Sequence, residues 1–78
     1  MNRQQILDLY QWGDGVCFRH PGTTTDTTVI RTLQPLSGPA EEIRACHACI
    51  LAMEAARRAA AEGARIPYVP GRAGEMLG

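Results

Sequence analysis

Hydrophobic and polar positions at the start of the chain follow a helical period. Asn2 and Gln5 have the spacing of a capping box at a helix N-terminus. Apolar residues then recur at the three- and four-residue intervals of one helix face, at Ile6, Leu9 and Tyr10. This pattern predicts a short helix over residues 3–11, which the Gly-Asp-Gly turn beginning at Gly13 ends.

The middle of the chain has the composition of a β-hairpin. A threonine-rich run over residues 23–28 leads into Val29–Leu33, where β-branched residues favour a strand. Pro35 and the Ser-Gly-Pro run at 37–39 supply the residues of a turn. We therefore expect the chain to fold back and to place a partner strand near residues 43–45.

An alanine-rich segment from Cys46 to about Ala64 predicts one long helix, because no proline interrupts it. Ile50 and Met53 are expected on its apolar side, and Gly63 is expected to stop it. The charged positions are expected to face water: Glu54, Arg57, Arg58 and Glu62.

The last part of the chain has no such periodicity. Residues 67–78 contain two prolines and three glycines, which favours an extended tail after a single domain over residues 1–66. The apolar stretch at 66–70 has two open destinations, a partner's surface or the core of its own domain.

Composition indicates a thin core. The 78 residues include only four aromatics, and much of the hydrophobic share of 45% is alanine, which buries little area. Chains of this size usually need a metal ion, disulfides or a partner to fold stably. An odd number of cysteines, three, fits reduced thiolates better than a disulfide-stapled secreted module.

Charge and hydropathy exclude further classes. Eight arginines balance eight acidic residues, so neither a general polyanion binder nor a protein of anionic membrane surfaces is indicated. Asp8 and several amides stand where a signal peptide would be apolar, and no apolar run approaches membrane-spanning length. We expect a cytoplasmic protein that does not enter a membrane.

Two pairs of cysteine and histidine residues have the spacing of metal ligands. Cys17 and His20 form one pair, Cys46 and Cys49 the other, and each pair has two residues between its members. Two such pairs can supply the four corners of a tetrahedral site, and three thiolates with one imidazole are a common structural zinc set. All three cysteines lie in these pairs, which argues against chance or simple burial. We predict one structural Zn²⁺ bound by these four residues.

Two alternatives concern the second pair. His47 competes with His20 as the nitrogen ligand, but neighbouring helical side chains diverge by about 100°, so Cys46 and Cys49 converge more easily on one ion. His47 is then expected to be solvated or to donate from outside the coordination shell. Two cysteines at a helix N-terminus also suit a redox dithiol, although this interpretation leaves Cys17 and His20 unexplained.

A turn with the first ligand pair, a hairpin, and a helix whose first turn carries the second pair together resemble a treble-clef zinc finger. The resemblance covers about residues 12–62 and implies a small zinc-stapled α+β fold with a zinc knuckle, a β-hairpin and a helix. The chain departs from the family pattern in having His20 where a cysteine is usual, and in placing Pro21 before the turn glycine. A zinc ribbon is the competing topology.

Four protein ligands would close the coordination sphere, whereas a catalytic zinc keeps an open position, so we do not expect an enzyme. The favoured function is that of a protein-interaction module with a regulatory or assembly role. The partner is either another protein or, in a homo-oligomer, a second copy of the chain. A nucleic-acid-binding zinc finger is the alternative, and a Cys-x-x-Cys redox or zinc-responsive switch is the third. The nucleic-acid interpretation depends on a stripe of six arginines: Arg19, Arg31, Arg44, Arg57, Arg58 and Arg65.

Overall fold

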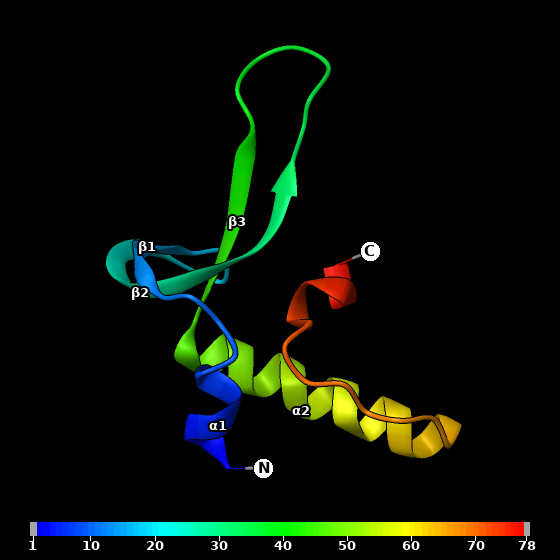
Figure 1. Ribbon diagram of the computed structural model, residues 1–78. Coiled ribbons are helices and arrows are strands. Elements are labelled where there is room, and N and C mark those ends of the chain that lie inside the picture. Colours follow the sequence, from blue (N-terminus) through cyan, green and yellow to red (C-terminus); the bar gives the residue numbers. More distant parts are fainter. Residues whose placement is uncertain (1, 78) are drawn as a thin grey trace.

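The fold is a small α+β arrangement of one sheet and two α-helices (Figure 1). The computed structural model describes residues 2–77, and side chains for residues 2–75. The sheet is antiparallel, with three strands in the order β1-β2-β3. The elements in chain order are α1 (Arg3–Leu7), β1 (Gly13–Cys17), β2 (His20–Leu33), β3 (Glu41–Cys46), α2 (His47–Ala64) and the 3₁₀ helix η1 (Ala73–Leu77).

The predicted hairpin is confirmed as the β2–β3 pair, in which Thr28 lies opposite Ala45 and Arg31 opposite Ile43. β2 is much longer than predicted, because the threonine-rich run also pairs, on its other side, with β1. β-branched threonines suit such a central strand. The sequence did not predict β1, since its two glycines read as a turn.

The far ends of β2 and β3 project away from the rest of the molecule (Figure 1). We call residues 31–42 the finger. The side chain of Leu36, in its loop, is fully exposed, and Leu33 is 38% exposed. All residues of the finger are exposed, so its apolar side chains face solvent.

α1 is shorter than the predicted helix over residues 3–11. The capping box of Asn2 and Gln5 is present, but the helix ends at Leu7. The indole N–H of Trp12 donates to the carbonyl oxygen of Leu7 at 2.7 Å, which satisfies a carbonyl at the end of the helix and turns the chain toward the sheet.

α2 matches the predicted long helix but does not stop at Gly63. The helix continues to Ala64, and Arg65 adopts the left-handed conformation that ends it, with φ of 57°. The helix begins at His47, with Cys46 in the N-cap position. Within residues 2–77, no helix combines the length and apolar character that crossing a membrane requires.

The core lies between the sheet and one face of α2. The predicted core positions Ile50 and Met53 are buried, together with Cys17, Ala45, Cys49 and Ala73. The prediction that Glu54 faces water is wrong, since its side chain is completely buried. Glu54 lies one helical turn after Ile50 and therefore shares its face.

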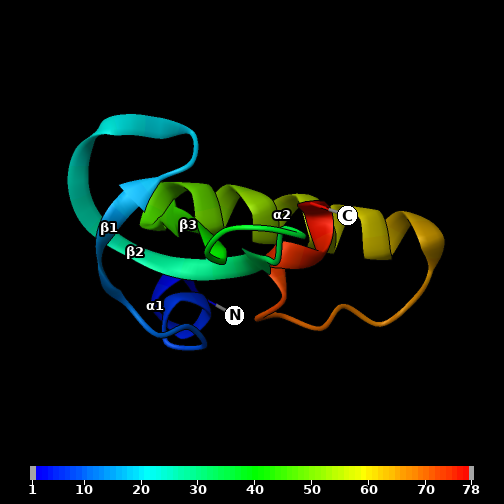
Figure 2. The same cartoon turned by 90° about the horizontal axis from the view of Figure 1, so that it is seen from above.

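The C-terminal segment returns along α2 toward the sheet (Figure 2). It is not extended throughout, as the sequence suggested, because Ala73–Leu77 form η1. In the apolar stretch at 66–70, Tyr68 is half-buried and bonds to α2, whereas Ile66 and Val69 are 61% and 50% exposed. The segment enters the core of the domain at Ala73. Ala73 is fully buried, and its backbone N–H donates to the hydroxyl of Tyr10 at 2.9 Å.

Candidate metal centre

The fold brings the two predicted ligand pairs together at one end of α2. Cys17 ends β1 and His20 begins β2, directly opposite each other across the first hairpin turn. Cys46 ends β3, and Cys49 lies in the first turn of α2. The four potential ligand atoms all lie within 4.8 Å of one another, so this cluster could hold a metal ion.

The spacing of these atoms fits a tetrahedral ion. With Zn–S bonds of about 2.3 Å and Zn–N bonds of about 2.1 Å, tetrahedral edges are about 3.8 Å between two sulfurs and about 3.6 Å between sulfur and nitrogen. The Sγ atoms of Cys17 and Cys49 are 3.6 Å apart. The Nδ1 atom of His20 lies 3.7 Å from Sγ of Cys46 and 3.6 Å from Sγ of Cys49. These three edges agree with one ion bound through Nδ1 of His20.

The corners of the cluster differ in their exposure. Cys17 is fully buried and Cys49 is 4% exposed, whereas Cys46 is half-buried and His20 is exposed. Cys17 and Cys49 also belong to the hydrophobic core. An ion bound here would therefore add to the small hydrophobic core on the side of Cys17 and Cys49, and it would lie closer to solvent on the side of His20.

The thiol environment favours a thiolate at Cys17. Burial raises the pKa of Cys17, but hydrogen bonds from the backbones of Cys46 and Arg19 and from the side chain of His20 outweigh burial and lower the pKa to about 6. Burial and the neighbouring thiols Cys17 and Cys46 raise the pKa of Cys49 to about 12. Burial and the neighbouring thiols thus both disfavour a thiolate at Cys49. A divalent ion would supply the missing positive charge.

Of the two histidines, His20 belongs to the cluster and His47 does not. His47, the alternative nitrogen ligand, lies outside the four-residue cluster. Its Nε2 atom lies 2.9 Å from Oδ2 of Asp26, and its ring meets that of Trp12 edge-on at a centroid distance of 4.3 Å. His47 is therefore held beside the site by contacts of its own.

The sequence does not indicate the positions of two acidic residues, Asp26 beside the cluster and Glu54 in the core. Asp26 lies next to Thr27, which pairs with Cys46, and this neighbourhood follows from a strand register that local spacing does not reveal. The charge of Glu54 favours the solvent face, but Glu54 lies four residues after Ile50, and this spacing places both residues on the buried face of α2.

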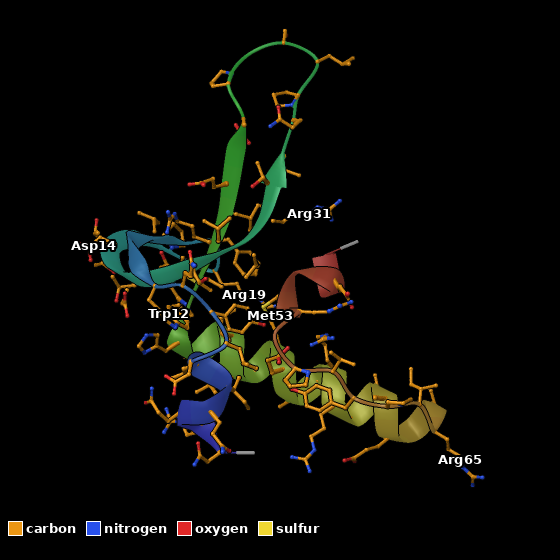
Figure 3. All side chains as sticks on the ribbon, viewed as in Figure 1. Trp12, Asp14, Arg19, Arg31, Met53 and Arg65 are labelled. Carbon is orange, nitrogen blue, oxygen red and sulfur yellow. The ribbon has the colours of Figure 1, made fainter. Side chains whose placement is uncertain are left out.

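The predicted arginine stripe is divided by ion pairs. Arg44 pairs with Glu42, Arg57 with Glu54 and Glu75, and Arg58 with Glu62. Arg19 lies over the ring of Phe18, 5.4 Å from its centroid, at the turn beside the cluster. Arg65 points away from the molecule at the far end of α2 (Figure 3).

Comparison of the chain with models of protein families, with curated proteins and with solved structures finds no match. The functional argument accordingly depends on the site itself, in which Cys17, His20, Cys46 and Cys49 form a cluster that could hold a metal ion and is compatible with a zinc finger.

Proposed function

We propose that this chain is a small treble-clef-like domain, held together by one structural zinc ion, and that it acts by binding a protein partner. The observation that carries the zinc part is the approach of four ligand atoms, from two pairs far apart in sequence, to within 4.8 Å of one another, with three of their separations close to tetrahedral edges. Three thiolates and one imidazole are soft ligands that suit zinc and its tetrahedral geometry.

A structural role is favoured over catalysis because four protein ligands occupy the whole coordination sphere. Zinc binding would tie the first hairpin turn to the start of α2, and three thiolates would give the loaded site a charge of about −1. A reducing cytoplasmic environment suits this function, since the ligands must stay unoxidised thiolates.

Protein binding is supported by the surface. The finger presents Leu33 and the fully exposed Leu36 to solvent, and apolar side chains in this setting are typical contact points for another protein. A partner that covers the finger, whether another protein or a second copy, would bury these leucines.

Nucleic-acid binding is the second candidate, and one contact favours it. Arg19 stacked over Phe18 offers a cation and an aromatic face side by side. Against it stand the ion pairs of Arg44, Arg57 and Arg58. Affinity for an oligonucleotide that falls steeply between about 50 and 200 mM salt would support this function in place of protein binding.

Metal content and folding test the zinc proposal. Native mass spectrometry should show one zinc per chain, and chelation should abolish the circular dichroism of the folded domain, which added zinc restores. Cys46→Ser should behave like the chelated protein. Ala48→Ser introduces the same side chain at an exposed position in the same helical turn and should fold normally.

A protein that keeps its spectrum and melting temperature after chelation would show that zinc does not hold this fold. Fast labelling of Cys46 and Cys49 in metal-free protein that is still folded would instead favour the redox dithiol. For the partner, capture from the native host with wild-type chain and with Leu36→Asp should differ, because the substitution places a charge at the centre of the proposed contact.

A further inference from the structure

A contact beside the candidate zinc site joins two elements that carry ligands. His47 is the first residue of α2 and follows Cys46 directly. Asp26 belongs to β2, the strand that begins with His20. Nε2 of His47 donates to Oδ2 of Asp26 at 2.9 Å, so one hydrogen bond links the strand of the first ligand pair to the helix of the second.

The surroundings fix His47 from a second side. The Trp12 ring packs against the imidazole edge-on, and Trp12 is itself anchored through its bond to the carbonyl oxygen of Leu7. Figure 3 shows Trp12 close to the start of α2. The imidazole is thus held by a carboxylate from the sheet and an aromatic ring from the segment before β1.

The register explains why this contact bears on the metal site. Thr27 lies opposite Cys46, the last residue pair of the β2–β3 ladder on this side. Beyond it the chain leaves the sheet and enters α2, so no further backbone pairing holds β2 to the residues that follow Cys46. The hydrogen bond between His47 and Asp26 joins the start of α2 to β2 at the point where the backbone pairing of β2 and β3 ends.

We propose that Asp26 and His47 are positioning residues that hold the two ligand pairs at coordinating distance and thereby slow the loss of zinc. This inference rests on the proposed zinc site and adds residues that do not bind the ion. Groups that hydrogen-bond directly to metal ligands commonly change metal affinity by about 10- to 100-fold when they are removed. Asp26 and His47 bond to each other beside the ligands, so about tenfold is the most we expect. The bond between Asp26 and His47 is partly exposed, with both side chains about half accessible, so we expect the lower end of that range.

The test measures how fast zinc leaves the loaded protein, with a chromophoric chelator in excess. Asp26→Ala should release zinc about tenfold faster than wild type, while still binding one zinc per chain. Its Co²⁺-substituted form should keep the wild-type absorption spectrum, because all four ligands stay in place. Asp26→Asn retains an acceptor oxygen and should release zinc more slowly than Asp26→Ala.

Two variants are matched controls. Asp14 lies directly across from Asp26 in the β1–β2 register, so Asp14→Ala removes the same charge from the same region but leaves the bond to His47. Glu62→Gln removes an exposed ion pair with Arg58 near the other end of α2. Both should release zinc at the wild-type rate.

His47→Gln and His47→Ala form a second pair that does not depend on the folding of the Asp26 variants. Glutamine keeps a side-chain N–H donor and should release zinc more slowly than alanine. Unchanged release by Asp26→Ala, or equal acceleration by Asp14→Ala or Glu62→Gln, would overturn the positioning role although zinc still binds. Absence of zinc from wild type would instead overturn the zinc site itself.

Discussion

The hydroxyl of Tyr68 donates a 2.9 Å hydrogen bond to Oε2 of Glu54, a carboxylate with no exposed surface. The same oxygen accepts the backbone N–H of Gly71 at 2.8 Å, and Oε1 accepts from Arg57 at 2.6 Å. A buried charge is costly unless its hydrogen bonds are satisfied. Glu54 meets this condition only because the C-terminal segment returns to α2, so the two features depend on each other.

Glu54→Gln should destabilise the zinc-loaded protein by about 3 kcal/mol, because breaking a buried, hydrogen-bonded ion pair leaves its partner poorly compensated. The amide would also place its N–H₂ group against groups that donate to Glu54, such as the backbone N–H of Gly71, where two donors face each other. Urea unfolding measures the change. Glu62→Gln is the control: its ion pair with Arg58 lies at the surface of the same helix, where the expected cost is below about 1 kcal/mol. Equal costs at the two positions would contradict the role assigned to Glu54.

Tyr68 should make stability depend on alkaline pH. Burial and the hydrogen bond to Glu54 raise the pKa of Tyr68 from 10.0 to about 12. The folded state therefore keeps this proton where the unfolded state loses it, and the stabilisation is complete below pH 10 and lost as pH rises from about 10 to 12. Urea midpoints of zinc-loaded protein between pH 9 and 11 should fall.

Tyr68→Phe should flatten this decline but not remove it. Burial also raises the pKa of Tyr10, which leaves a residual slope of the same sign. A variant that loses stability with pH as steeply as wild type would show that Tyr68 ionises alike in the folded and unfolded chain.

Two glycines should respond to alanine in opposite directions. A Cβ at Gly74 would overlap the carbonyl oxygen of Ile30, so Gly74→Ala must lift η1 from β2 and should destabilise by about 1–3 kcal/mol. Gly63 lies inside α2 with nothing near its Cβ position, and Gly63→Ala should stabilise by about 0.5–1 kcal/mol. Thermal unfolding of both variants measures these changes. A neutral Gly74→Ala would argue against the close packing of η1 on β2.

Substitution of the two histidines should affect the metal site differently. His20→Ala removes the proposed nitrogen ligand, whose Nδ1 atom lies 3.6 Å from Sγ of Cys49, and the Co²⁺-substituted protein should lose the absorption typical of a tetrahedral three-thiolate, one-imidazole site. His47→Ala should keep one ion per chain and the same spectrum, with faster metal release. If His47→Ala alone loses the spectrum, the ligand assignment is reversed.

The sequence by itself determined the local features of this protein. The capping box of Asn2 and Gln5, the β2–β3 hairpin and the long helix depend on residue types and spacings within a few positions, and all three are present. The grouping of Cys17, His20, Cys46 and Cys49 also follows from the sequence, because a single backbone turn brings the two members of each pair close together.

Tertiary structure decided what depends on contacts between distant segments. Glycine-rich β1 becomes a strand because the threonines of β2 pair with it, and α1 is cut short where Trp12 bonds back to Leu7. Glu54 changes from a solvent-facing charge to a buried acceptor because Tyr68 and Gly71 return to it, and His47 finds Asp26 through the strand register. Spacing fixes which side chains share a face, but burial and partners arise only when separate elements pack together.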